Sequence, residues 1–436
     1  MKLTGLAVAC GLLFAPFVLA GEAGAVDIER VVSPKGIEAW LVSEHTVPVI
    51  AVSFAFEGGS AQDPKGKAGV ATLLSGLLDE GAGSLDSRAF QSALDDYSIG
   101  LSFDASRDTF SGSLQTLTEH RDEAVRLTRL ALTEPRFDAE PVERIRSQIL
   151  TGIKASERDP GEIASRAMME AIFGGHPYAA PSEGTVESVT AITADDLRLW
   201  HDKILARDNL KVAVVGDIDA ATLGPMLDAI FSDLPVKANR IGVSDVAPRE
   251  AEAIDVPMAI PQAIIQVAGN GLKRDDPDYI TASVASYILG GGSFSSRLYD
   301  EIREKRGLAY SVWLGLIPLD HAGLWFVSTS TRADQADTVV ALIESEIKRF
   351  AEEGPTEQEL ADAKAYLIGS YPLRFDSSSD IADQLLAIQM ENLGIDYVDK
   401  RNDLIAAVTI DDIRRVSKRL FAGDDRVVVR VGAPAT

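Results

Sequence analysis

Apolar and polar positions in the first part of the chain follow two spacings. Residues 49–56 form a β-branched and aromatic run, which predicts a strand. Residues 101–114 alternate and are interrupted by polar pairs, which predicts two strands joined by a turn. Apolar residues at helical spacing predict helices over 69–78, 87–97, 119–132 and 138–157, with Asp86 and Thr118 as N-caps of the second and third.

This pattern recurs in the second part of the chain. Asp63-Pro64 precedes an apolar helical run, and Asp276-Pro277 precedes another one 213 residues later. The segment 192–197 resembles 408–413, and 211–216 resembles 427–432, both at an offset of 216 residues. Strands and helices are mixed without strict alternation, which is typical of an α+β fold.

The repeat predicts two homologous domains, each with an antiparallel-rich sheet covered by helices. We expect the first domain to span residues 26–236 and the second to span residues 251–436. The polar, proline-containing stretch 237–250 would join them.

The N-terminus has the features of a secretory signal. A short positive start, Met1-Lys2, precedes an apolar run that ends near Leu19, and small residues follow at 18–20 and 23–25. These features predict a cleaved signal peptide over residues 1–25 and a periplasmic mature protein; the alternative is an uncleaved anchor. Cys10 is the only cysteine, so the mature chain would contain no thiol and no disulfide.

Composition narrows the range of partners. The formal net charge is -24, and the acidic residues are spread along the chain. Nucleic acids and anionic membrane surfaces are bound by basic patches, so neither is an expected partner, and no direct membrane insertion is expected. The 46% of hydrophobic residues is enough for large cores.

The segment GKAGVATLLSGLLDEG, residues 66–81, resembles the zinc-helix region of the pitrilysin (insulinase) family of metallopeptidases. Catalytic members of that family carry His-x-x-Glu-His on this helix, where two histidines bind zinc and the glutamate activates water. The matching positions here are Thr72, Ser75 and Gly76, and the third-ligand position matches Thr151 or Gly152. The resemblance therefore implies a degenerate zinc site and no metal in this chain.

The histidines support the same expectation independently. No two of the five lie three to five residues apart, so no pair on one helix can chelate a metal; they are His45, His120, His176, His201 and His321. His176, in Gly-Gly-His-Pro-Tyr, is expected to be a structural loop residue.

A second segment, LGGGSFSSRLYDEIREKRGLAYSV at residues 289–312, resembles the other conserved site of the family. Its pattern predicts a charged helix over 296–306, Gly307 at the C′ position and a strand from 308 to 316. The resemblance implies that Arg303 and Tyr310 hold a substrate carbonyl and donate hydrogen bonds to the oxyanion formed during peptide hydrolysis. Gly290, Gly291 and Gly292 would allow a substrate or partner backbone to approach closely, or they form a simple turn.

One half of an active site implies a partner with the other half. The resemblance suggests the non-catalytic, Arg/Tyr subunit of a two-chain enzyme of the mitochondrial-processing-peptidase type. The expected partner is a homologous zinc-bearing subunit, and the expected substrates are unfolded or short peptides. The alternatives are a non-enzymatic scaffold or peptide-binding relative, and a chain that hydrolyses peptides by an unrelated site.

Overall fold

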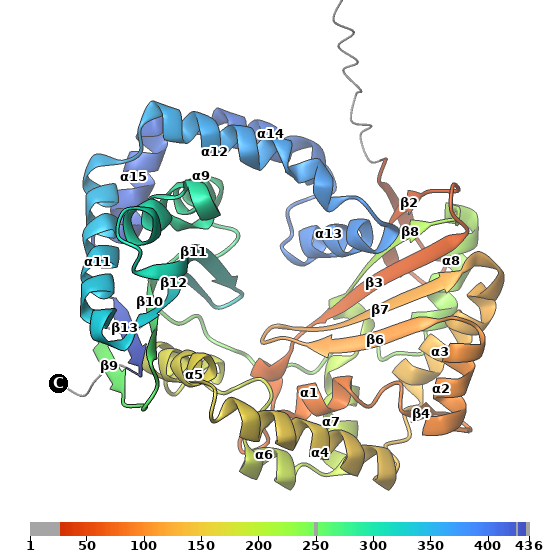
Figure 1. Cartoon of the computed structure of the whole chain (residues 1–436). Helices are drawn as coiled ribbons and strands as arrows, with labels where there is room; N and C mark the ends of the chain where they lie inside the picture. The colour runs from red at the N-terminus through yellow and green to blue at the C-terminus, as the bar shows by residue number, and fades with distance from the viewer. Residues whose placement is uncertain (1–26, 248–251, 424–425, 433–436) are drawn as a thin grey trace, which may run out of the picture.

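The structure is a computed structural model that describes residues 27–247, 252–423 and 426–432. The predicted signal peptide, residues 1–25, lies outside the described residues. The chain forms two halves that face each other, each built on one large sheet (Figure 1). No helix among the described residues is long and apolar enough to cross a membrane.

The sheet of the first half has the strand order β1-β2-β8-β3-β7-β6. Its pairs are antiparallel except for β2 and β8, which run parallel. Alternate side chains of the central strand, such as Ile50, Val52 and Phe54, are buried in the core on the outer face. The strands are β1 (Glu29–Val32), β2 (Glu38–Ser43), β3 (Val49–Glu57), β6 (Gly100–Ala105), β7 (Thr109–Leu117) and β8 (Leu210–Gly216), with a small separate hairpin of β4 (Gly81–Ala82) and β5 (Leu85–Asp86).

Most helices of the first half cover the outer face of this sheet or extend its core. They are α1 (Val70–Ser75), α2 (Ser87–Asp96), α3 (Arg121–Thr133), α4 (Ala139–Ser156), α6 (Val186–Ala191), α7 (Ala194–Ile204) and α8 (Ala220–Phe231). The predicted strands at 49–56 and within 101–114 are confirmed, as is the cap of α2, where Asp86 accepts from the Ala89 N–H at 2.9 Å. Residues 237–247, the described part of the predicted linker, contain no helix or strand.

Two local predictions in this half are wrong. The helix expected over 69–78 ends at Ser75, because Gly76 takes the C-cap position and the chain continues in turns. Thr118 does not cap α3; its hydroxyl donates to Asp217 at 2.9 Å, and a short 3-10 turn at 118–120 precedes the helix. The Thr118 hydroxyl, which the sequence predicted as the cap of the helix, is thus hydrogen-bonded to Asp217 on a distant loop.

The second half repeats the same strand connectivity. Its order β9-β13-β10-β12-β11 matches β2-β8-β3-β7-β6, with the one parallel pair, β13 and β9, in the corresponding place. The predicted α+β fold of two homologous domains is therefore confirmed. The strands are β9 (Glu252–Val256), β10 (Gln262–Asn270), β11 (Ala309–Leu319), β12 (Ala322–Arg332) and β13 (Val427–Val431).

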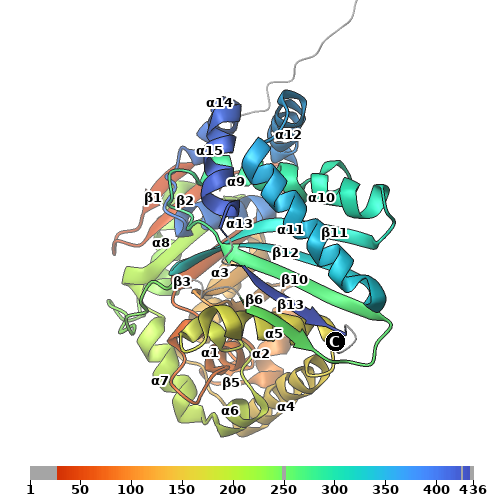
Figure 2. The ribbon, with the colours of Figure 1, turned by 90° about the vertical axis from the view of Figure 1, so that its left-hand side faces the viewer.

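Helices again cover the outer face, where α11 lies across the strands (Figure 2). They pack on a core that includes Ile265, Val267 and Trp325. The helices of this half are α9 (Tyr279–Ser286), α10 (Arg297–Tyr299), α11 (Ala336–Glu353), α12 (Glu357–Gly369), α13 (Ser378–Met390), α14 (Tyr397–Ala407) and α15 (Ile410–Phe421).

One helix from each half packs against the inner face of the sheet of the other half. Helix α5 (Pro160–Phe173), from the first half, buries Met168 and Ile172 against β10 and β13. Helix α13, from the second half, packs on the first sheet in the same way and buries Leu385 against β3 and β8 (Figure 1). The two halves therefore share apolar cores on both inner faces.

Polar contacts reinforce this exchange. Ser53 on β3 donates to Asp383 on α13 at 2.6 Å. The Tyr178 hydroxyl, in the loop after α5, donates to Asp108 at 2.6 Å and accepts from the main-chain N–H of His321 at 3.1 Å. Burial, followed by the neighbouring Asp108 carboxylate, raises the pKa of Tyr178 well above its usual range, so the phenol stays protonated.

Candidate functional site

The helix that carries Arg303 is short and widened. Helix α10 runs directly into a π-helical turn at Asp300–Glu304, in which the Lys305 N–H donates to the Asp300 carbonyl at 2.9 Å. The helix predicted over 296–306 is thus confirmed in place, but it ends earlier and is partly of π type. Such turns are frequent at functional sites.

Gly307 ends this helix as predicted. Its φ of 62° lies in the left-handed region, and its N–H donates to the Arg303 carbonyl at 2.8 Å. The following N–H, of Leu308, donates to the Ile302 carbonyl at 3.0 Å. The cap turns the chain back at once into β11, so residues 303 and 310 come together.

Tyr310 lies at an irregularity at the start of β11. The pairing of β11 with β12 shifts register between Ala309 and Val312, and Tyr310 falls inside that shift. Its side chain is 80% exposed. A register shift of this kind changes the direction of side chains, and here the Tyr310 phenol is exposed to solvent at the start of the edge strand β11.

Arg303 contacts Tyr310 in two ways. Its Nη1 donates to the Tyr310 carbonyl at 2.8 Å, and its Cζ lies 4.6 Å from the Tyr310 ring centroid. The same guanidinium lies 5.0 Å from the Tyr299 ring and 5.9 Å from the Phe294 ring. Arginine stacked on aromatic faces is held in orientation while its remaining N–H groups stay available.

Sequence reasoning missed Tyr299 and Phe294 as neighbours of Arg303. The signal for Tyr299 was present, because residues four apart share one face of a helix. Phe294 carries no such signal, since it precedes the helix; its ring lies near Arg303 and packs edge-on against Tyr299, with ring centroids 5.1 Å apart.

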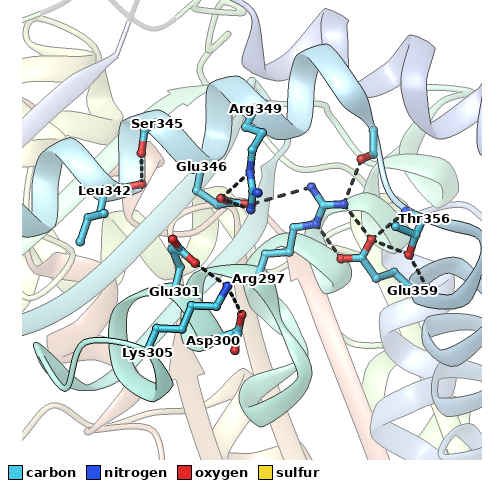
Figure 3. Close-up of polar contacts among 11 residues, drawn as sticks. Arg297, Asp300, Glu301, Lys305, Leu342, Ser345, Glu346, Arg349, Thr356 and Glu359 are labelled. Atoms are coloured by element: carbon cyan, nitrogen blue, oxygen red, sulfur yellow. Dashed lines mark hydrogen bonds and ion pairs between the residues drawn. The ribbon is translucent and has the colours of Figure 1, made fainter.

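The other basic residues of this segment are neutralised. Lys305 donates to Glu301 at 2.8 Å and lies 2.8 Å from Asp300, as Figure 3 shows, and Arg306 also pairs with Glu301 at 2.8 Å. The bond from Lys305, ahead of the one from Arg306, lowers the pKa of Glu301 despite partial burial. Arg303 has only a 3.8 Å contact with Glu304, so it is the least neutralised cation of this helix.

Arg297 anchors the helix to the two helices behind it (Figure 3). Its Nε and Nη2 donate to Glu359 on α12 at 2.6 and 2.7 Å, and Nη2 also donates to the Gly354 carbonyl at 3.0 Å. Its Cζ lies 5.0 Å from the Phe350 ring on α11. Burial raises the pKa of Glu359, but bonds from Arg297 and Thr356 outweigh burial and hold it at about 2. Arg297 thus fixes the helix that carries Arg303 against α11 and α12.

The positions of the degenerate zinc motif are buried or half-buried and hold only neutral groups. The Thr72 hydroxyl donates to the Ser182 carbonyl at 2.7 Å, and the Ser75 hydroxyl donates to the Thr72 carbonyl at 2.9 Å. A Cβ at Gly76 would lie 3.0 Å from Ile145 on α4. The hydroxyls are therefore used in backbone bonds, and a longer side chain at Gly76 meets α4.

The third-ligand position offers no carboxylate. Thr151 on α4 donates to the Ser147 carbonyl at 2.7 Å, and Gly152 beside it is exposed. Within residues 27–247, 252–423 and 426–432, no group of three or more His, Cys, Asp or Glu side chains is arranged to hold a metal ion.

The histidines have structural partners on separate elements. His176 accepts from the Tyr178 N–H at 3.2 Å, so its other ring nitrogen donates to the Ser244 carbonyl at 3.0 Å. His201 is buried, with Nε2 at 2.9 Å from the Leu132 carbonyl. The expected structural role of His176 agrees with these contacts.

Comparison with known proteins places the chain in a family. Residues 39–186 match the model described as "Insulinase (Peptidase family M16)", and residues 191–367 match "Peptidase M16 inactive domain". A Helicobacter pylori protein named "Non-peptidase homolog YmxG" is 30% identical over 338 residues, covering 77% of this chain and 78% of that protein. The chain belongs to the peptidase M16 (insulinase) family. The family resemblance predicted from residues 66–81 and 289–312 is confirmed at this level.

Other M16 relatives carry different names. An uncharacterized zinc protease of Streptomyces coelicolor is 27% identical over 422 residues, covering 92% of this chain and 89% of that protein. The solved structure described as the peptidase M16 inactive domain from Pseudomonas fluorescens has a TM-score of 0.88 and 29% identity, covering 94% of this chain and 99% of that one. A protease structure from Helicobacter pylori, at 18% identity, shares the fold with a TM-score of 0.83. The chain is thus similar both to proteins named as proteases and to a protein named as a non-peptidase homolog.

The glycine run of this M16 chain has a packing role. Gly290 is buried at the end of a π-helical turn, Tyr287–Gly291, and a Cβ there would lie 2.4 Å from the Cβ of Leu314 on β11. A Cβ on Gly292 would lie 3.1 Å from the Tyr287 ring. At Gly290, close approach is therefore to the chain's own strand. Substrate binding by Gly290, Gly291 and Gly292 stays a prediction.

Proposed function

We propose that this M16 chain is the zinc-free partner subunit of a two-chain peptidase and supplies Arg303 and Tyr310 to an active site whose metal lies on the partner. The observation that carries the proposal is the contrast between two places in the fold. Neutral groups occupy Thr72, Ser75 and Gly76, whereas Arg303 and Tyr310 form a supported, solvent-accessible pair.

The chemistry of the pair suits an oxyanion. A guanidinium and a phenol both donate hydrogen bonds at neutral pH. When water attacks a peptide carbonyl, negative charge develops on its oxygen, and donors already held in place stabilise that charge. Arg303 is held by aromatic rings and by a helix anchored through Arg297, so little reorganisation is needed.

The proposed partner is a homologous chain with an intact His-x-x-Glu-His motif, and the proposed substrates are unfolded or short peptides. The proposed compartment is the periplasm, based on the signal-like residues 1–25. Mass determination of the N-terminus of protein recovered from the periplasmic fraction tests the compartment. A full-length protein retained in the membrane would contradict it.

The deciding experiment measures hydrolysis of a quenched fluorescent peptide by the zinc-bearing paralogue, with and without this chain. We expect no hydrolysis by this chain alone and a many-fold increase when the two are mixed. Analytical ultracentrifugation of the same mixture reports whether the two chains associate. Association without any gain in rate would remove the proposed role of Arg303 and Tyr310.

The second candidate is a non-enzymatic scaffold or peptide-binding protein. The name of the 30% identical Helicobacter pylori relative, a non-peptidase homolog, favours it. The two candidates differ in what Arg303→Ala does. In a scaffold it leaves the activity of any bound peptidase unchanged, whereas in the split site it lowers that activity.

A further inference from the structure

A pocket of about 310 Å³ lies in the second half, among α9, α12, α13 and α14 and a 3-10 turn at Tyr371–Arg374. Its wall contains three arginines, Arg274, Arg374 and Arg401, and no aspartate or glutamate. Its volume is at the lower end of the range for small-molecule sites.

None of these three arginines forms an ion pair with any carboxylate in the part of the chain that the structure describes. The protein has 66 acidic and 42 basic residues, and most of its described arginines do form an ion pair with a carboxylate, as Arg297 and Arg419 do. Arg274 also lines a neighbouring pocket that contains four carboxylates, but it forms an ion pair with none of them; they are Glu57, Asp275, Asp320 and Glu391. Burial raises the pKa of Glu391, although Arg274 opposes this shift. The pocket is therefore a concentration of positive charge in an acidic molecule.

Tyrosines hold two of the guanidiniums in place. Arg274 donates to the Tyr397 hydroxyl at 2.8 Å and lies 4.4 Å from the Tyr279 ring centroid. Arg401 lies 4.1 Å from the Tyr371 ring centroid and donates to the Leu367 carbonyl at 3.1 Å. These contacts fix the side chains, but they do not neutralise their charge.

The arginines also act on one another. Burial lowers the pKa of Arg401; interactions with Tyr397 and Tyr371 oppose this shift, whereas the charges of Arg374 and Arg274 add to it. Placing like charges around a partly enclosed space costs free energy unless a counter-charge offsets it. The exposed side chain of Arg374 forms no hydrogen bond with any described residue, so its guanidinium is available for a ligand.

We propose that this pocket binds a small phosphate-bearing anion. Three guanidiniums offer paired N–H donors to several oxygens, which suits phosphate geometry. A phosphate group carries about 1.5 to 2 negative charges at neutral pH and three acceptor oxygens, more than a single carboxylate. The tyrosine rings of the wall provide flat surface for a group attached to the phosphate.

The bound anion would also support the contact between the halves. Gln384 and Ile388 of α13 line the pocket, and Ile388 belongs to the apolar core that α13 shares with the first sheet. Filling the pocket therefore stabilises the helix that crosses between the halves. This inference does not depend on the proposed peptidase role.

The test is isothermal titration calorimetry of the full mature chain with inorganic pyrophosphate, with adenosine diphosphate and with citrate. We expect saturable binding of at least one phosphate compound. Tighter binding of the nucleotide would assign an organic phosphate, and equal binding would assign the phosphate group alone. Arg374→Gln is expected to weaken binding about ten- to hundredfold, because it removes charged hydrogen bonds.

Arg88→Gln is the matched control, because it removes one positive charge from an exposed site on α2 without touching the pocket. The Arg88→Gln variant should bind the phosphate compound with the same affinity as the unmodified chain. Circular dichroism must show the same fold for both variants, and Arg274→Gln provides a second pocket variant. Absence of saturable phosphate binding, binding of citrate alone, or equal weakening by Arg88→Gln would overturn the proposal.

Discussion

Arg303 is held by the main chain and the ring of Tyr310, and not by its hydroxyl. The Nη1–carbonyl distance is 2.8 Å and the cation-to-centroid distance is 4.6 Å. The two proposed donors can therefore be separated by mutation, since removal of the hydroxyl leaves the support of Arg303 intact.

We expect Tyr310→Phe and Arg303→Ala each to lower the kcat of the assembled peptidase by about a hundredfold, as loss of one oxyanion donor does. Tyr310→Phe should leave KM and assembly unchanged, because the ring and the carbonyl remain. Peptide hydrolysis at saturating partner concentration measures this. Arg88→Ala, on α2, is the control, and a wild-type rate in both site variants would refute the assignment.

Loss of Arg297 should destabilise the second half. Arg297→Ala removes the partner of Glu359 and leaves the nearby, almost fully buried Glu346 without its second cation. Breaking a partly buried ion pair of this kind costs about 2 to 4 kcal/mol in the free energy of unfolding. Urea unfolding followed by circular dichroism measures the loss. Arg332→Ala, whose exposed pair with Asp334 is worth less than about 1 kcal/mol, is the control.

The Arg297–Glu359 pair also predicts an acid dependence. The pKa of Glu359 is about 2 in the folded protein and 4.5 in its ordinary state. A lowered pKa stabilises the fold above pH 4.5, and this stabilisation is lost as the pH falls toward 2. Glu359→Gln should therefore show a smaller fall in Tm between pH 4.5 and 2 than the unmodified chain. Parallel curves would contradict the low pKa.

The raised pKa of Asp63 predicts a contribution to stability that falls, and does not rise, as the pH increases toward neutral. It accepts from the main-chain N–H of Gly69 at 2.7 Å and of Ala71 at 3.1 Å at the start of α1, and burial raises its pKa to about 7. A raised pKa contributes stability fully below pH 3.8, and that contribution is lost as pH rises through 7. The difference in Tm between Asp63→Asn and the unmodified chain should therefore change between pH 4 and 8. A constant difference would exclude titration of Asp63.

The exchanged helix α13 should couple the two halves. Leu385→Ala empties a fully buried position between α13 and the first sheet, which costs about 2 to 5 kcal/mol. We expect calorimetric unfolding to separate toward two transitions as this contact weakens. Leu404→Ala on α14, where the side chain is 46% exposed, should leave one transition. A single unchanged transition in Leu385→Ala would show that the halves are coupled elsewhere.

Restoring the histidine motif alone should not create a zinc site. In T72H/S75E/G76H the third-ligand position still holds Thr151 or Gly152, and the new side chain at residue 76 meets Ile145. Structural and catalytic zinc sites in proteins use at least three protein ligands. Zinc content measured by atomic emission after dialysis should stay far below one per chain. Stoichiometric zinc would show that α4 can move to supply a ligand.

Local spacing was enough to predict most elements of the first half. The period of apolar residues sets which face of a strand or helix is buried, so β3, β6, β7 and α2 could be placed without any tertiary information. The repeat at offsets near 216 predicted two similar domains, because equal sequence patterns form equal strand connectivity. The failed cap at Thr118 shows the limit, since its partner Asp217 is 99 residues away.

Some features of the candidate site were likewise predictable from the sequence, and others required the tertiary structure. The neutral character of Thr72, Ser75 and Gly76 follows from residue identity alone. The pairing of Arg303 with Tyr310 was implied by the family resemblance, because local sequence by itself predicts an exposed charged helix face and a packed tyrosine. Only the folded chain decided that Arg303 lies among aromatic rings and that Arg297 meets Glu359, 62 residues later. The exchange of α5 and α13, and the arginines gathered around the pocket, also required the tertiary structure. An amphipathic pattern specifies that one face of a helix is buried, but it does not specify which sheet covers that face. The hydrophobic effect is non-directional and depends on the apolar area buried, so any apolar surface can serve as the partner.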